Sequence, residues 1–363
     1  MLDSEQANTL RRNKILIRGE TMKKDNSQLI MTLLKGRTFI VLILLVIFFS
    51  FASSSFLSLN TLTMVAKHVA LYGILALGMT FVIITGGIDL SVGSVVGLVG
   101  MLAGGLIQEG LTIGGKTIYF TVPAIIVLML CMGCLIGLVN GLIITKLNVA
   151  AFITTLGTMY ICRGLANLRS AGATFSSIGG FEGLGNVGLK SFGANWFGIP
   201  AGVYVFAILS IIAALLLNRT PTGWHFLAVG GNEKSAKLSG IKADRVKILA
   251  YVISGFCAAW IGIINTAQLS AAHPASGDGW EMNAIAATVL GGTSMSGGSG
   301  TIIGTIVGAF VIGVINDGMT MCGVSEFWQK IIRGAVIILA VIIDQTQRNL
   351  QAKMALQARN ESK

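Results

Sequence analysis

The chain has 363 residues, of which 53% are hydrophobic and only 11% are charged, and its mean hydropathy is +0.79. Soluble domains carry about 25% charged residues, so this composition excludes an ordinary soluble protein and indicates a membrane protein. The apolar residues occur in blocks of roughly 20, the length of an α-helix that crosses a hydrocarbon layer about 30 Å thick. We therefore expect an all-α fold, a polytopic bundle of transmembrane helices.

The formal net charge of +11 is concentrated in three clusters of Lys and Arg. Eight of these residues lie in 11–37, six in 219–247 and four in 348–363. Each cluster flanks apolar blocks, as the positive-inside rule requires, whereas a nucleic-acid-binding domain gathers its basic residues on one folded unit. We therefore expect a lipid membrane around the chain and no nucleic-acid partner.

About ten membrane segments follow from the apolar windows. They are 38–57, 66–86, 91–107, 119–143, 149–168, 199–218, 246–268, 283–293, 300–320 and 327–344. An even number of crossings places both termini on one side, and the basic clusters place that side in the cytoplasm. Lys330 and Arg333 are an exception, since they fall at the outer end of the last segment, where long basic side chains can reach the interface.

This topology divides the chain into three parts. A basic cytoplasmic segment (1–37) precedes a transmembrane domain (38–345), and a cytoplasmic tail (346–363) follows it. The connection 219–245 lies inside, and the loops 169–198 and 269–282 lie outside.

Two glycine-rich stretches interrupt the apolar pattern, GGIDLSVGS at 86–94 and GGTSMSGGS at 291–299. At an offset of 205 residues they are identical at five of nine positions, which indicates an internal repeat. Both lie toward the cytoplasmic half in the predicted topology, so the repeat is parallel and not inverted. The candidates for helix breaks on a transport path are Gly86, Gly87, Ser91, Gly291 and Gly292, together with Asp89.

Asp89 lies in the first break, where a carboxylate at membrane depth costs about 2.5–3.5 kcal/mol and needs compensation. One explanation is an N-cap on the segment that begins at Ser91, because free N–H groups and the helix dipole favour an acid there. The alternative is a residue that lines the transport path. Other polar residues at membrane depth either line the path or bond a neighbouring helix. They are Asn140, Thr154, Thr155, Arg163, Asn167 and Asn283.

The connection 219–245 contains a short amphipathic stretch at 230–241. An Asn suited to an N-cap, flanking glycines and an apolar set of Ala236, Leu238 and Ile241 predict a short helix on the cytoplasmic face. Such a helix either docks in the groove of a partner or is a plain surface helix. The docking candidates are Gly231, Asn232, Glu233, Ala236, Ser239, Gly240 and Ile241.

Five motifs occur in the order found in a known family. They are GGIDLSVGS at 86–94, NGLIIT at 140–145, AFITTLGTM at 151–159 followed by Arg-Gly at 163–164, GNEKSAKLSGI at 231–241 and NAIAATVLGGTS at 283–294. Over 38–345 the chain resembles the ribose/xylose/arabinose-type permease family of sugar ABC importers. Ala150, Asn283 and Ser299 depart from the family pattern, and the loss of an acid at 283 together with a base at 299 indicates an altered polar pairing at the second break.

The resemblance implies the function and the partners. The implied function is that of the permease subunit of a monosaccharide importer in a bacterial inner membrane. The implied partners are a second permease copy or homologue, a cytoplasmic ABC ATPase and a periplasmic sugar-binding protein. It also implies that 231–241 is the helix that couples the permease to the ATPase.

The sequence contains no G-x-x-x-x-G-K-[ST] phosphate loop, so ATP hydrolysis is expected in a separate protein. We expect no enzymatic activity, catalytic residue, metal site or cofactor in this chain. A secondary transporter for a small polar solute is the alternative, because broken helices and internal repeats also occur there. Within the ABC class, the substrate could instead be a polyol or a sugar-like signal.

Overall fold

The computed structural model describes residue 36 and residues 38–361, and they are mostly helical. Each of the ten predicted segments overlaps a helix. The helices are Thr38–Ala52, α2 (Leu59–Ile84), α3 (Val92–Gln108), α4 (Val122–Lys146), α5 (Ala151–Leu168), α6 (Ala201–Arg219), α7 (Pro221–Gly231), α8 (Glu233–Leu238), α9 (Ala243–Leu269), α10 (Trp280–Leu290), α11 (Ile302–Met321) and α12 (Glu326–Glu361). The sheets in the described residues are antiparallel strand pairs. They are β1 (Leu111–Ile113) with β2 (Lys116–Ile118), β3 (Phe175–Ser176) with β6 (Ala271–Ala272), and β4 (Asn195–Trp196) with β5 (Ile199–Pro200).

Five helices, α2, α4, α6, α9 and α11, are long and apolar enough to cross a membrane. The all-α polytopic bundle predicted from composition is therefore confirmed. By contrast, α10 has 11 residues and is about 16 Å long, so it crosses only part of a hydrocarbon layer.

Two boundaries differ from the prediction. Helix α2 begins at Leu59, ahead of the predicted 66, because Ser58 caps it by accepting a hydrogen bond from Thr61 N. Helix α12 continues through most of the predicted tail 346–363. The predicted segment 1–37 lies outside the described residues apart from residue 36.

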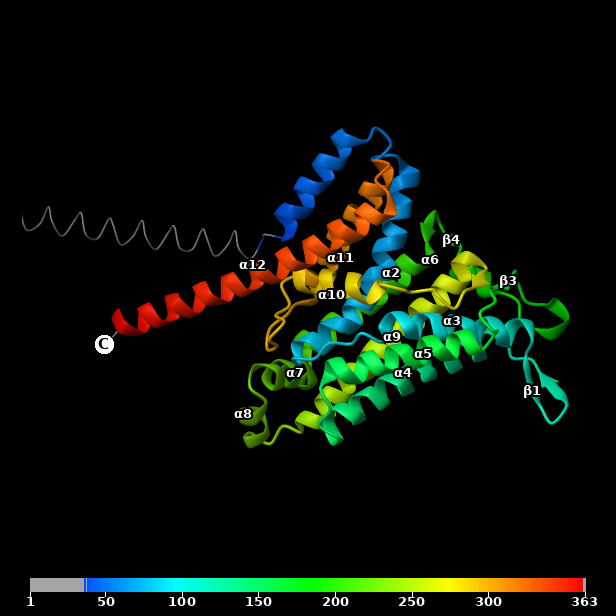
Figure 1. The fold of residues 1–363 in the computed structure, drawn as a ribbon, viewed down its shortest axis with the longest axis horizontal. Helices are drawn as coiled ribbons and strands as arrows, with labels where there is room; N and C mark the ends of the chain where they lie inside the picture. Colours follow the sequence, from blue (N-terminus) through cyan, green and yellow to red (C-terminus); the bar gives the residue numbers. More distant parts are fainter. Residues whose placement is uncertain (1–35, 37, 362–363) are drawn as a thin grey trace, which may run out of the picture.

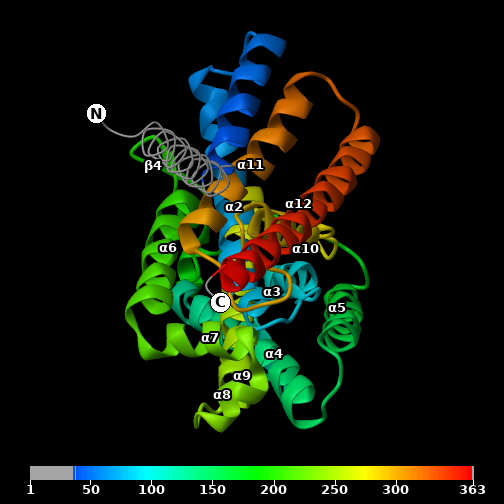
Figure 2. The same ribbon diagram turned by 90° about the vertical axis from the view of Figure 1, so that its left-hand side faces the viewer.

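Figure 1 shows α7 and α8 at one end of the molecule and the strand pairs β1–β2 and β3–β6 at the opposite end. Between the ends, α3, α4, α5 and α9 run side by side, and α2 passes through the middle of the bundle. Figure 2, turned by 90°, shows α5 and α6 on opposite flanks of α2 and α3. From Ile74 to Ile84 every residue of α2 is buried, so α2 and α9 form the core on which the other helices pack.

Close helix packing depends on glycines that face backbone. On α4, a Cβ added to Gly133 would lie 2.3 Å from Gly255 O on α9, and one added to Gly137 would lie 2.2 Å from Tyr251 O. On α11, a Cβ on Gly308 would lie 1.9 Å from Ala287 O of α10. Because any larger side chain would push these pairs apart, the glycines set the spacing of the bundle.

The predicted outer loop 269–282 is not a simple surface connection. Its Gly277 approaches α3 so closely that a Cβ on Gly93 would lie 2.3 Å from Gly277 O. From α5, Arg163 donates to the carbonyl oxygens of Pro274 and Ser276, the latter at 2.9 Å. The loop is therefore drawn back into the bundle, and Arg163 holds it there instead of extending to the membrane interface.

Candidate functional site

The first break closes α2 with a left-handed glycine. Gly86 has φ +79° and donates from its N–H to Ile83 O at 2.9 Å, while Gly87 N donates to Val82 O at 3.0 Å. This pair of bonds is the Schellman pattern, which glycine favours because it has no Cβ to clash at positive φ. The helix therefore stops at the glycine pair that the sequence singled out.

The second break closes α10 in the same way, but one residue later in the repeat. Gly292 has φ +88° and donates to Val289 O at 2.8 Å, and Thr293 N donates to Thr288 O at 3.1 Å. Gly86 is thus the structural counterpart of Gly292, at an offset of 206 residues and not the predicted 205. Sequence identity aligns both glycine pairs, whereas the backbone turn requires only one glycine at positive φ.

Asp89 is fully enclosed in the first break, with only 1% of its surface exposed. Its Oδ1 accepts hydrogen bonds from Ser91 N at 3.0 Å and from Ser91 Oγ at 2.6 Å, and its Oδ2 accepts from Ser254 Oγ at 2.7 Å. In the described part of the chain no Lys or Arg forms an ion pair with it. Three neutral donors therefore compensate the burial of this carboxyl group.

The predicted N-cap is wrong in its position. Helix α3 begins at Val92, its N-cap is Ser91, and the Ser91 side chain makes no capping hydrogen bond. Asp89 lies two residues before that cap and bonds Ser91 N, so its carboxyl group shapes the turn that enters α3.

A hydrogen-bond network extends from Asp89 to neighbouring helices. Asn140 Nδ2 on α4 donates to Ser91 Oγ at 3.1 Å, and Thr158 Oγ1 on α5 donates to Asn140 Oδ1 at 2.6 Å. Thr155 Oγ1 lies 2.9 Å from Ala151 O of its own helix and 3.3 Å from Ile88 O, so its single proton is shared between the two carbonyls. Sequence reasoning missed Thr158 and Ser254, because a single hydroxyl in an apolar helix does not stand out from others.

Three of the other predicted path residues do not join this network. Thr154 Oγ1 bonds Ala150 O within its own helix, and Asn167 Nδ2 bonds Arg163 O in the same manner. Asn283 is buried on α10, and its amide nitrogen has no hydrogen-bond partner in the described part of the chain.

The two breaks and α7 meet at one backbone junction. Gly298 N in the second break donates to Ile84 O, the last carbonyl of α2, at 2.9 Å. From α7, Gly230 packs against both, because a Cβ placed on it would lie 1.7 Å from Ile84 O and 2.6 Å from Gly298 N. This junction links α7 to both breaks, and nothing in the sequence indicated that Gly230 contacts them.

Helix α8 forms where the sequence predicts it. Asn232 is its N-cap, with Oδ1 accepting from Ser235 N at 2.9 Å. Gly240 adopts φ +83° and Ile241 N donates to Ala236 O at 3.0 Å, which closes the helix.

Ion pairs hold α8 against α9. Glu233 pairs with Lys237 at 2.8 Å and with Lys247 of α9 at 2.5 Å. Hydrogen bonds from these two ammonium groups hold the pKa of Glu233 below its ordinary value. Nearby, Lys146 at the end of α4 pairs with Asp244 at 2.7 Å. Partly exposed pairs such as these contribute about 0–1 kcal/mol each, so they orient α8 more than they stabilise the fold.

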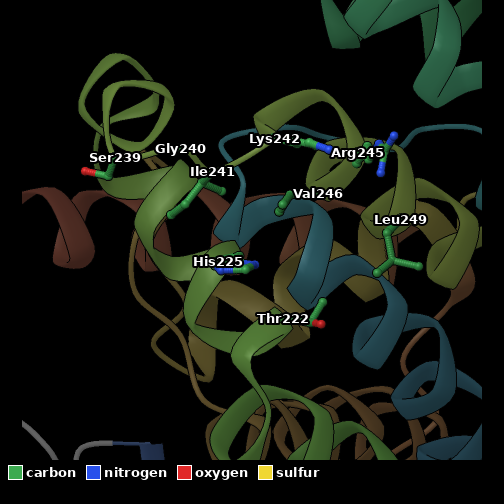
Figure 3. A pocket seen from close by; sticks show the side chains of 9 residues that line it. All are labelled: Thr222, His225, Ser239, Gly240, Ile241, Lys242, Arg245, Val246 and Leu249. Carbon is green, nitrogen blue, oxygen red and sulfur yellow. The ribbon is translucent and has the colours of Figure 1, made fainter.

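The single apolar face predicted for α8 is wrong. Ala236 is buried, whereas Leu238 is 89% exposed, because two residues span about 200° of an α-helix and face opposite sides. Beside α8, a groove of about 420 Å³ opens between α7 and α9 (Figure 3). It is lined by Thr222, His225, Ser239, Gly240, Ile241, Lys242, Arg245, Val246 and Leu249.

Known proteins share this chain's sequence over most of its length. A family model described as the permease component of a branched-chain amino acid transport system matches residues 61–341. The ribose import permease of Bacillus subtilis (strain 168) is 41% identical over 309 residues, 85% of this chain and 91% of that protein. The ribose import permease of Escherichia coli (strain K12) is 37% identical over 87% of this chain and 95% of that protein. The galactose/methyl galactoside import permease of the same strain is 38% identical over 89% of this chain and 98% of that protein. No solved structure gives a significant match.

The chain therefore belongs to this family of permease components, and it is a multi-pass membrane transport subunit and not an enzyme. Within that class it belongs with the ribose-type sugar ABC permeases, the family that its five ordered motifs resemble.

The Asp89 network predicts the effect of Asp89→Asn. The amide oxygen can accept both bonds from Ser91, and the amide nitrogen can donate to Ser254 Oγ, so the turn should survive. We expect a stability loss of about 1 kcal/mol or less and near-normal transport. Uptake below about a tenth of wild type at equal expression, a loss of roughly 1.4 kcal/mol, would show instead that Asp89 serves the transport path.

The junction predicts that substitution of Gly230 lowers stability and that substitution of the adjacent Gly231 does not. Gly230→Ala would force Ile84 and Gly298 apart, and overpacking of this kind costs about 1–3 kcal/mol. Gly231→Ala is the matched control, because nothing lies within 4 Å of its added Cβ. Thermal unfolding of the purified protein in detergent should show a lower Tm for Gly230→Ala alone. Equal Tm values for the two variants would contradict the close contact.

Proposed function

We propose that this chain is the permease subunit of an ABC importer for a monosaccharide, in which the two helix breaks line the path and α8 couples to the ATPase. The observation that carries the proposal is the junction of Ile84, Gly298 and Gly230, because it joins both breaks to the cytoplasmic helices. The relatives, named as ribose and galactose import permeases, support the choice of a monosaccharide.

The surface around α8 fits an ATPase partner. Leu238 projects into solvent beside the groove between α7 and α9, and Trp224 on α7 is 65% exposed. An exposed apolar side chain next to a groove is what a protein partner needs as an anchor. Lys242 and Arg245 line the groove, so the complementary surface of the partner should be acidic.

The remaining features of the proposal rest on charge and on the family. The basic clusters favour a bacterial inner membrane with both termini in the cytoplasm, a basic segment at 1–37, a permease domain at 38–345 and a tail at 346–363. A second permease copy would complete the path, and a periplasmic sugar-binding protein would deliver substrate at the end that carries the strand pairs.

Docking predicts that Leu238→Asp separates the permease from its ATPase. A charge in place of an exposed leucine removes the apolar anchor, and we expect ATPase recovery in co-purification to fall at least ten-fold. Leu184→Asp, at an exposed leucine of the loop between α5 and α6, is the control that should leave recovery unchanged. Full recovery with Leu238→Asp would exclude α8 as the anchor.

The energy source separates this proposal from a secondary transporter. Uptake of radiolabelled ribose or galactose should persist when a protonophore collapses the proton gradient and the ATP concentration is held constant. A carrier driven by protons would stop under the same conditions, and that result would favour the alternative.

A further inference from the structure

A second cluster of polar and aromatic side chains lies away from both breaks. Tyr72, at the midpoint of α2, packs edge-on against Trp280, the first residue of α10, with ring centroids 5.8 Å apart. The ring of His68, one turn earlier on α2, lies 6.4 Å from that of Tyr72. Two aromatic rings and an imidazole thus gather where the half-length helix α10 begins.

The last turns of α11 bring two further polar groups to Tyr72. Asp317 Oδ1 lies 2.7 Å from His68 Nδ1, while Asp317 Oδ2 has no hydrogen-bond partner in the described residues. Asn316 lies beside Tyr72, yet neither its amide nitrogen nor its amide oxygen makes a hydrogen bond that meets ordinary geometry within the described residues. Asn316 and Asp317 are 7% and 4% exposed.

Buried polar atoms without partners are rare in native proteins, because removing them from water is costly unless a new hydrogen bond forms. Here three such atoms occur on the adjacent residues Asn316 and Asp317, and both residues are close enough to Tyr72 to act on it electrostatically. A ligand that both donates and accepts hydrogen bonds would satisfy all three, since an amide offers both roles and a carboxylate accepts.

The surroundings select among ligands. A solute carrying a carboxylate would be repelled by Asp317, and an apolar solute would leave the amide unpaired. A ring with several hydroxyl groups suits the cluster, because each hydroxyl donates and accepts while the C–H edges can pack on the aromatic faces of Tyr72 and Trp280. His68 is 35% exposed in its side chain, so the cluster opens on that side.

The cluster also accounts for a basic residue that contradicts the charge pattern. Arg333 on α12 lies close enough to Tyr72 to act on it electrostatically and is half-buried. Its guanidinium group offers further donors to a hydroxylated ligand.

We propose that a binding site for a monosaccharide is formed by Tyr72, Trp280, His68, Asn316 and Asp317. It lies at the start of α10, at the opposite end of that helix from the second break. The site rests on the proposed function, since it assigns side chains to the sugar that the importer carries. The unpartnered atoms of Asn316 and Asp317 are buried, so the sugar would reach them past His68, on the exposed side of the cluster.

Asn316→Leu distinguishes a sugar site from a purely structural cluster, because only a sugar site predicts a loss of uptake without a loss of stability. Replacing an unpaired buried amide by an apolar side chain of similar shape should leave stability equal or higher. If the amide also contacts sugar, uptake of radiolabelled ribose and galactose at saturating concentrations should fall at least ten-fold. Ser210→Ala on α6 is the matched control, since Ser210 Oγ is likewise buried without a partner in the described residues, and its uptake should be unchanged.

The experiment uses the full chain expressed with its ATPase and binding protein, and it records the Tm and ATPase co-purification of each variant. Asn316→Leu with normal Tm, normal co-purification and uptake within two-fold of wild type would overturn the site and leave the proposed function standing. If Asn316→Leu fails to insert, Tyr72→Phe decides, because it removes one hydroxyl and keeps the ring. Uptake within two-fold of wild type in that variant overturns the site. A wild-type importer that moves neither sugar would overturn the proposed function and, with it, the site.

Discussion

A backbone that leaves its helix inside an apolar bundle must find new partners for its N–H and C=O groups, and the first break shows where they are found. The carbonyl of Ile84 accepts from Gly298 in the second break, that of Ile88 accepts from Thr155 on α5, and the amide of Ser91 bonds Asp89. These three groups are thus taken up within the turn or by another element. The interruption of α2 therefore holds the second break and α5 in place.

Two acids show how the surroundings decide what a carboxyl group requires. Asp89 is enclosed by helices and is met by hydroxyl and amide donors, whereas Glu233 lies on α8 at one end of the molecule and is met by two lysines. A buried ion pair often costs more in desolvation than it returns, so neutral donors suit the interior, and screened ion pairs suit the surface. The first arrangement fixes a turn, and the second fixes the direction of α8.

These contacts form one continuous connection through the protein. Helix α8 is tied to α9 by Lys247, α7 meets both breaks at Gly230, and α10 runs from the second break back to Trp280 beside Tyr72. A movement of α7 cannot leave the breaks unchanged, because their backbones already touch without intervening side chains. In the proposed importer, this contact would give an ATPase docked at α7 and α8 a physical means to act on the two breaks.

The sequence by itself determined the helical membrane fold, both glycine breaks and α8 with its Asn232 cap, because these depend on composition and on short-range backbone chemistry. Only the tertiary structure decided the partners of Asp89, the fold-back of the loop held by Arg163, and the outward direction of Leu238. It also decided the gathering of Tyr72, Trp280 and Asn316. These features join residues more than a hundred positions apart, or depend on which side of a helix meets a neighbour. Local pattern carries no information on either, since a glycine, serine or tyrosine looks the same in the sequence whether it faces lipid, another helix or a ligand.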